Sequence, residues 1–233
     1  MIIITLSNYR YYNYTLSIDG IPEYYGDVDE EDYLTDVIGR KAEDFLSNLM
    51  DGKELDEANP FLMVLAFHAP HDPATPALKY ADYFTEEIAP RTPAFNYVDD
   101  IYNQKHWLLR HGMLPLDQSV INQIDLELQN RWRTLLSVDD VVDNVMTKLD
   151  ELGVLNDTFV LFTSDHGFHL GQFAMPLGKF QPYETGESIM FNWFILIENC
   201  LYSMDHYRII INMQNPCFRY SCSPFGARSW NQT

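Results

Sequence analysis

Two stretches of the chain carry apolar residues at helical spacing. The first runs from about Glu30 to Met50, and the second runs from about Gln118 to Leu152. In both stretches apolar side chains return every three or four residues, which predicts amphipathic helices with one buried face. Polar residues after Met50 end the first helix. Gly153 stands where a left-handed cap would end the second helix.

Two shorter runs are almost wholly apolar. FLMVLAF covers Phe61–Phe67, and TFVLFTS covers Thr158–Ser164 after a turn at Asn156-Asp157. Such runs predict strands, and the first has the pattern of a strand buried on both faces. The order strand, loop, long helix and strand predicts an α/β domain. We expect a central mixed, largely parallel sheet flanked by helices.

The segments between these elements are less regular. HAPHDPATP follows Phe67, and its three prolines exclude a helix and predict an irregular loop. Residues Tyr80 to Pro115 mix aromatic, proline and polar residues without a sustained period, which predicts a long, partly structured excursion. From Glu187 onward apolar and polar residues alternate with no settled period, so no element is predicted there.

The net charge and the cysteine content of the chain both change after residue 184. The formal net charge is −19 at pH 7, and all of it lies in residues 1–184, whereas residues 185–233 are neutral. The three cysteines, Cys200, Cys217 and Cys222, also lie in that last part. We therefore expect a body of residues 1–184 and a divergent, poorly ordered tail of residues 185–233.

The same composition narrows the classes of partner. A strongly acidic body argues against nucleic acid or an anionic membrane as a broad-surface partner. The sequence has no apolar run near 18 residues, so no membrane span is expected. The opening MIIITLSNYRYYNY has no basic region before its apolar residues, so it does not read as a secretory signal peptide.

Candidate chemistry lies where the two predicted strands end. His71 follows the first strand, and the second strand runs directly into Asp165-His166-Gly167. In open α/β sheets ligands bind beyond the carboxyl ends of the strands. Lys179 follows a turn at Pro176 and Gly178 and could supply a cation for an anionic substrate. We therefore expect His71, Asp165 and Lys179 to surround a common anion.

Simpler interpretations of these residues exist. Asp165 could cap a following helix, His166 could be a surface imidazole, and a lone lysine such as Lys179 is most often solvated. Two histidine-bearing strand ends favour the site over those interpretations. The chain carries no phosphate-cradling glycine loop, no Gly-x-Ser-x-Gly elbow and no Cys-x-x-Cys pair.

Seven ordered stretches of the chain resemble a known family. They are YYNYTLSIDG, DYLTDVI, HAPHDP, NQKHWLLR, RWRTLLSVDD, LNDTFVLFTSDHGFHLGQF and GKFQPYE, and they span Tyr11 to Glu184. Their order resembles the sulfatases, and within that family the N-acetylglucosamine-6-sulfatases, with the extracellular heparan endosulfatases as near relatives. The resemblance implies an alkaline-phosphatase-like fold and hydrolysis of sulfate esters of heparan sulfate or other glycosaminoglycans, such as N-acetylglucosamine 6-sulfate.

The resemblance also implies roles for individual residues. Asp165 and His166 would be ligands of Ca²⁺, His71 would assist proton transfer around the leaving group, and Lys179 would neutralise sulfate charge. A hard cation suits carboxylate oxygen, and charge on sulfate oxygens suits fixed cations. The substrate contacts implied are His169, Lys105 and His106.

The chain departs from the family in ways that affect activity. The Cys-x-Pro-Ser-Arg motif that yields the formylglycine nucleophile is absent, and so is the paired aspartate that completes the metal site. The likeness ends after Glu184. We therefore expect a middle part of a sulfatase that is inactive alone, because the missing groups act as a unit with those present.

Family membership would place the protein in the lysosome or outside the cell. Asn13 and Asn156 lie in Asn-x-Thr acceptors and are candidate glycosylation sites. Two other functions stay open on the sequence. One is a metal-dependent phosphodiesterase or phosphatase of the same superfold with zinc at the Asp-His-Gly turn. The other is a non-catalytic glycan-binding fragment.

Overall fold

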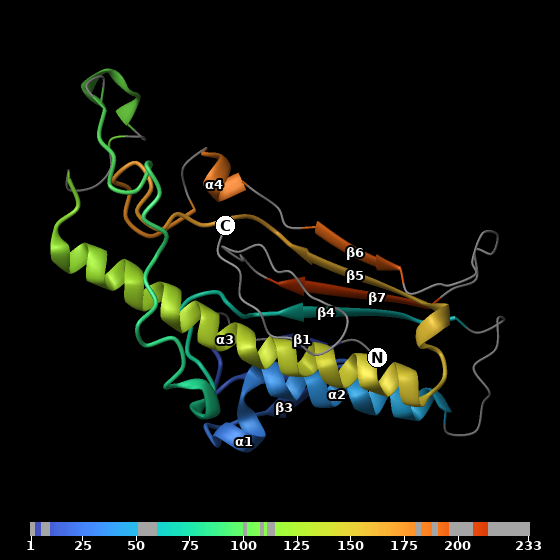
Figure 1. Ribbon diagram of the computed structural model, residues 1–233. Coiled ribbons are helices and arrows are strands. Elements are labelled where there is room, and N and C mark those ends of the chain that lie inside the picture. The colour runs from blue at the N-terminus through green and yellow to red at the C-terminus, as the bar shows by residue number, and fades with distance from the viewer. Residues whose placement is uncertain are drawn as a thin grey trace.

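A four-stranded sheet lies against two long helices, and a small antiparallel sheet lies beside them (Figure 1). The computed structural model describes residues 3–5, 10–50, 60–99, 102–107, 110, 115–179, 183–187, 191–195 and 207–213. None of the helices described is both long enough and apolar enough to cross a membrane.

The larger sheet has the strand order β4-β7-β5-β6. β4 (Leu62–Phe67), β7 (Tyr207–Met213) and β5 (Thr158–Ser164) are parallel, and β6 (Phe191–Ile195) pairs antiparallel with β5. This is the mixed, largely parallel sheet that the sequence predicts. The bounds of β5 match the predicted run, and β4 begins one residue after it.

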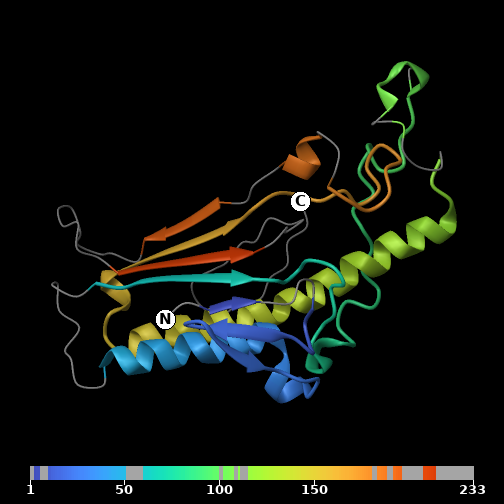
Figure 2. The same cartoon turned by 180° about the vertical axis from the view of Figure 1, so that it is seen from behind.

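The register of β7 aligns the ends of its two neighbours. Phe67 of β4 and Ser164 of β5 both pair with Met213. The two strands therefore end at the same level of one edge, separated by two strand spacings or about 10 Å. The arrowheads of all three parallel strands point to that edge in both views (Figures 1 and 2). The prediction that the two histidine-bearing loops leave a common edge is confirmed.

The first predicted helix is interrupted near its start. α1 (Asp29–Asp32) and α2 (Leu34–Met50) are separated by Tyr33, whose backbone is extended with ψ 118°. The backbone N–H of Leu34 donates to the carbonyl of Tyr11 at 3.0 Å instead of to a helical carbonyl. The buried Tyr33 hydroxyl donates to the Thr75 carbonyl at 3.0 Å. These tertiary contacts explain a break that periodicity alone does not reveal.

The second predicted helix is present almost as expected. α3 spans Gln118–Glu151 and begins at Asp117, whose carboxylate accepts hydrogen bonds from the backbone of Ser119 and Val120. Gly153 adopts φ 71°, the left-handed conformation that ends many helices. α3 packs on α2 and its apolar face covers the sheet, as side chains such as Leu149 and Val160 share one core.

One face of β4 is open, which corrects the prediction of a strand buried on both faces. Met63, Leu65 and Phe67 are buried, whereas Leu62 and Val64 are 60% and 53% exposed. Both long helices lie on the same side of the sheet (Figures 1 and 2). In the part of the chain that the structure describes, alternate residues of β4 therefore face the helices or the open side.

The smaller sheet joins β1 (Ile3–Thr5), β2 (Thr15–Ile18) and β3 (Ile21–Tyr24) in antiparallel order. Asp19 and Gly20 form its tight turn with φ 50° and 87°, the left-handed pair that suits a two-residue hairpin. The pattern of this region predicted no element. Side chains of β2 pack on α2, which fixes the small sheet to the rest of the fold.

The remaining elements are short. They are η1 (Leu78–Tyr80), η2 (Tyr102–Gln104), η4 (Leu155–Asp157) and α4 (Glu184–Glu187). The predicted excursion of Tyr80 to Pro115 thus contains little regular structure among its described residues. β6 and β7 come from the range in which no element was predicted. They form strands because they pair with β5 and β4, which a local sequence pattern does not reveal.

Candidate active site

The loop after β4 is held by backbone and side-chain hydrogen bonds. The His71 N–H donates to the His68 carbonyl at 2.8 Å, and the Ala74 N–H donates to the His71 carbonyl at 3.0 Å. The buried Tyr11 hydroxyl donates to the same His71 carbonyl at 2.9 Å. The His71 ring stays half-buried, with Nδ1 3.0 Å from the Asp72 carbonyl. The loop therefore presents this imidazole from a fixed backbone.

His68 is a second imidazole in this loop that the sequence did not single out. Its ring lies 5.3 Å from the His71 ring and meets the Tyr11 ring edge-on at 4.9 Å. Burial, with a smaller contribution from the charge of His71, lowers the pKa of His68 to about 4. His68 is thus neutral in mildly acidic solution. Its position directly after Phe67 was the available signal.

This pKa predicts a pH dependence of stability. An unfolded histidine has a pKa of about 6.5, so the unfolded chain binds more protons between pH 6.5 and pH 4. Stability should therefore be unaffected by His68 above pH 6.5 and fall as the pH drops towards 4. We expect a loss of about 1 kcal/mol, because the half-buried ring keeps some contact with solvent.

Urea unfolding at several pH values tests this expectation. His68→Phe retains an aromatic contact with Tyr11 but cannot titrate, so its stability should change less with pH than that of the unaltered chain. His106→Phe replaces an exposed histidine of the excursion by the same residue and provides the comparison for a change outside this loop. Equal pH slopes for the unaltered chain and His68→Phe would show that the His68 ring is solvated.

The loop after β5 brings three predicted residues together. Asp165 Oδ2 lies 3.1 Å from His166 Nε2, and the same ring nitrogen lies 3.0 Å from Lys179 Nζ. Asp165 Oδ1 accepts a hydrogen bond from the His166 backbone N–H at 2.8 Å. Asp165 therefore pairs with its neighbour His166. Carboxylate, imidazole and ammonium form one continuous polar cluster at the carboxyl end of β5.

Gly167 allows this loop to pass close to α4. Its N–H donates to the Gly186 carbonyl at 3.0 Å. A Cβ atom at this position would lie 2.1 Å from the Thr185 carbonyl oxygen, far inside van der Waals contact. No other residue fits here unless the backbone of α4 moves, so the close approach of the two segments requires glycine at this position.

His169 lies deeper than a substrate contact was expected to lie. His169 is 1% exposed. Its backbone N–H donates to the Gly178 carbonyl at 2.7 Å, and its ring Nδ1 lies 2.9 Å from Thr185 Oγ1. These contacts join the Asp165 loop to the backbone beside Lys179 and to α4. His169 thus holds the backbone on either side of the cluster in place, and its contact with a substrate stays a prediction.

Lys105 and His106 lie on the excursion. The Asn96 N–H donates to the Gly171 carbonyl at 2.8 Å, which fastens the excursion to the loop after β5. Lys105 Nζ pairs with Asp99 Oδ2 at 2.7 Å. The hydrogen bond to Asp99 raises the pKa of Lys105, and the nearby Tyr183 adds to the effect. Lys105 is therefore held by a partner within the excursion itself.

His106 is exposed, and its ring lies 5.5 Å from the ring of Trp107. Tyr183, which lies near Lys105, also contacts His169, because the two rings lie 6.2 Å apart. The predicted residues thus fall into three groups. They are the His71 loop, the cluster of Asp165, His166 and Lys179, and the excursion with Lys105 and His106.

The described residues do not by themselves make a metal site. Among them no group of three histidine, cysteine, aspartate or glutamate side chains is arranged to hold an ion. Asp165 and His166 offer one carboxylate and one imidazole, and His166 Nε2 already lies 3.0 Å from Lys179 Nζ. Ca²⁺ takes about six to eight oxygen ligands. The two predicted ligands are therefore insufficient for Ca²⁺ without further groups.

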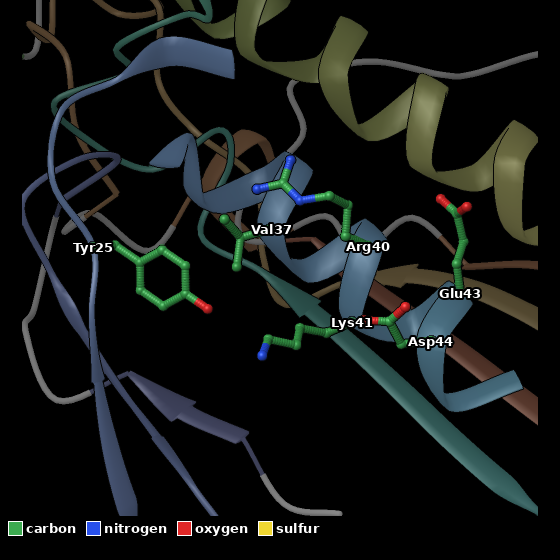
Figure 3. A pocket seen from close by; sticks show the side chains of 6 residues that line it. All are labelled: Tyr25, Val37, Arg40, Lys41, Glu43 and Asp44. Atoms are coloured by element: carbon green, nitrogen blue, oxygen red, sulfur yellow. The ribbon is translucent and has the colours of Figure 1, made fainter. Parts of the chain in front are cut away.

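A cavity elsewhere in the molecule carries none of the predicted residues. Its volume is about 330 Å³, and it is lined by α2 side chains and by Tyr25 (Figure 3). Lys41 is paired with Glu23 at 2.9 Å, and Arg40 donates to the backbone carbonyls of Glu30 and Glu31. Its cationic groups are thus engaged within the protein, and the cavity is not the candidate site.

Comparison with known proteins identifies the family. The sulfatase family model matches residues 5–195, which include both loops and Lys179. The chain belongs to the sulfatase family. The sulfatase match extends beyond Glu184 into β6, so it reaches further than the sequence motifs indicated. The proposed boundary at residue 184 is therefore not a boundary of the family match.

Several curated sulfatases are similar to this one. Human N-acetylglucosamine-6-sulfatase is 44% identical over 177 residues, which cover 76% of this chain and 30% of that protein. A putative extracellular sulfatase, the Sulf-1 homolog of Caenorhabditis elegans, is 36% identical over 179 residues, covering 77% of this chain and 24% of that protein. This chain thus spans less than a third of the length of each of these two relatives.

A solved structure shows the fold. It is a complex with the substrate D-glucosamine-2-N,6-O-disulfate, and it matches with a TM-score of 0.62 at 21% sequence identity. The match covers 82% of this chain and 48% of that chain. This member of the sulfatase family therefore has the predicted alkaline-phosphatase-like fold in part, with its polar cluster at the carboxyl edge of the sheet.

Proposed function

We propose that this chain carries part of the active site of a sulfuric ester hydrolase of the N-acetylglucosamine-6-sulfatase type. The observation that carries the proposal is the cluster of Asp165, His166 and Lys179 at the end of β5. The strand ends on either side of β7 are level, so the His71 loop starts about 10 Å away. A sulfate group placed between these loops would meet cationic and imidazole groups from both.

The residues suit the binding of an anionic ester. The Lys179 ammonium can donate to sulfate oxygens and offset the charge that develops there. His71 is half-buried on a fixed loop, and an imidazole can give a proton to a leaving alcohol near neutral pH. Lys179 is a cationic group in a chain of net charge −19. The proposed substrate is a 6-sulfated glucosamine of heparan sulfate or another glycosaminoglycan.

Sulfatases generally use Ca²⁺ and a formylglycine. Asp165 is the residue we propose to bind Ca²⁺ through carboxylate oxygen, with His166 as the weaker ligand because imidazole nitrogen suits Ca²⁺ less well. When bound, Ca²⁺ would supply positive charge against the sulfate. The other ligands it needs are not among the described residues. The chain contains no Cys-x-Pro-Ser-Arg motif to yield a formylglycine, so we propose that it binds the ester without hydrolysing it.

Binding and turnover measured on the same purified chain test this function. We expect N-acetylglucosamine 6-sulfate to shift backbone NMR signals near Lys179, and unsulfated N-acetylglucosamine to shift them much less. No hydrolysis of 4-nitrocatechol sulfate should be seen. Lys179→Met should weaken binding of the sulfated sugar about tenfold, or ~1.4 kcal/mol. Lys148→Met removes a lysine of α3 that pairs with Glu151 and should leave binding unchanged.

Other outcomes distinguish the alternatives. Turnover by the chain alone would contradict the proposed absence of catalysis. Zinc-dependent preference for the 6-phosphate over the 6-sulfate would favour a phosphatase or phosphodiesterase of the same superfold. Equal binding of sulfated and unsulfated sugar would favour a general glycan-binding surface and would refute a sulfate site at Lys179.

We also propose a lysosomal or extracellular location. Asn13 and Asn156 are both exposed and therefore accessible to glycosylation. A relative named as an extracellular sulfatase supports a secretory route for the family. Attached glycans on either asparagine would support this location, because glycosylation of Asn-x-Thr sites takes place in the secretory pathway.

A further inference from the structure

One buried side chain of α3 touches both loops of the candidate site. Arg131 is 3% exposed at its side chain. Its Nη1 donates to the Pro70 carbonyl at 2.9 Å, and its Nη2 pairs with the Asp72 carboxylate. The centre of the same guanidinium lies 3.8 Å from the centroid of the Phe168 ring. Pro70 and Asp72 flank His71, and Phe168 follows His166 and Gly167.

Arginine is the residue that can make all of these contacts at once. The planar guanidinium donates in several directions at once and also stacks on an aromatic face. Nε donates to Glu127 Oε1 at 2.6 Å, one helical turn earlier. That bond orients the guanidinium from its own helix. Burial raises the pKa of Glu127, while the charge of Arg131 acts in the opposite direction.

We propose that Arg131 is the positioning residue of this site. It holds the loop of His71 and the turn at Gly167-Phe168 at a fixed separation across the carboxyl edge of the sheet. It thereby sets His71 relative to the cluster of Asp165, His166 and Lys179. This proposal rests on the proposed function of that cluster. Displacement of a site group by about 1 Å can cost about a hundredfold in rate, so a fixed separation matters to a sulfate site.

A neighbouring arginine provides a matched comparison. Arg133 lies two residues along α3 and is also buried, at 8% exposure. Its Nε donates to the Tyr83 carbonyl at 2.6 Å, and its Nη1 donates to Asn130 Oδ1 at 2.8 Å. Arg133 therefore supports the excursion and not the two site loops. An effect specific to positioning should follow Arg131, and a general effect of a buried arginine should follow both.

The experiment compares Arg131→Lys with Arg133→Lys in the full chain. The histidine ring signals of His71 and the aromatic ring signals of Phe168 are followed by NMR, and N-acetylglucosamine 6-sulfate is titrated into each variant. For Arg131→Lys we expect both sets of signals to move and the affinity to fall at least tenfold. For Arg133→Lys both signals and affinity should match the unaltered chain, even where thermal stability falls equally.

The spectroscopic readout separates this proposal from the proposed function. If the unaltered chain binds no sulfated sugar, the proposed function fails, but joint movement of the His71 and Phe168 signals still supports positioning. If Arg131→Lys moves the signals of neither loop, or of one only, Arg131 does not connect them. Should Arg131→Lys not fold, Phe168→Leu removes the ring from the guanidinium while keeping an apolar side chain. His71 signals unchanged in Phe168→Leu would overturn the proposal.

Discussion

Removal of residues 185–233 should abolish the cooperative unfolding transition of the chain. β7 lies between β4 and β5, and its six-residue and seven-residue registers pair with both. Without β7 these two strands have no backbone partner between them, and unmade backbone hydrogen bonds in a sheet centre are costly. Small domains are stable by only ~5–15 kcal/mol, so loss of a central strand should exceed what the fold can withstand.

Urea titration followed by circular dichroism provides the measurement. A chain that ends at Glu184 should show no sigmoidal transition, whereas a chain that ends at Met213 keeps β7 and should retain one. The same comparison tests the proposed division into a body of residues 1–184 and a separate tail. If the shorter chain unfolds at the same urea concentration as the full one, residues 185–233 do not contribute to the sheet.

Among substitutions that add one methyl group near the site, Gly167→Ala should cause the largest loss of stability and binding. The new Cβ would lie 2.1 Å from the Thr185 carbonyl oxygen, a backbone atom that cannot rotate away. Either α4 or the Asp165 loop must move, and the hydrogen bond from Gly167 to Gly186 would lengthen. We expect a loss of about 1–3 kcal/mol in stability and at least a tenfold weaker binding of N-acetylglucosamine 6-sulfate.

Gly26→Ala is the control for this substitution. Its Cβ would lie 3.0 Å from Asp32 Oδ2, the end of a flexible side chain that can move aside. Stability and sugar binding should both stay near those of the unaltered chain. Wild-type binding by Gly167→Ala would mean that α4 does not pack against the Asp165 loop in solution.

The sequence predicts the elements whose signals are local. α3 has bounds close to those expected, because its long helical period and Gly153 mark it in the sequence. β5 has the expected bounds because its apolar run is continuous. β7 was not predicted, because its order comes from pairing with β4, more than 140 residues earlier in the chain. Its uninterrupted apolar run covers only residues 209–211 between Arg208 and Asn212, which local pattern does not distinguish from irregular sequence.

The site divides in the same way. Asp165, His166 and Lys179 could be predicted because a strand end, a glycine turn and a family motif mark them. Arg131 could not, since nothing in a helical Arg-Trp-Arg indicates that one guanidinium reaches Pro70, 61 residues away. The low pKa of His68 likewise depends on burial against Tyr11, which comes from a distant part of the chain.

The open face of β4 has a consequence for how the molecules behave towards one another. The apolar side chains of Leu62 and Val64 are exposed to solvent, and the chain carries a formal net charge of −19. In dilute buffer like charges hold the particles apart, and at about 0.1 M salt that repulsion reaches only ~10 Å. Adding salt should therefore make the protein less soluble, because screening weakens the repulsion that keeps the exposed apolar residues of two molecules apart.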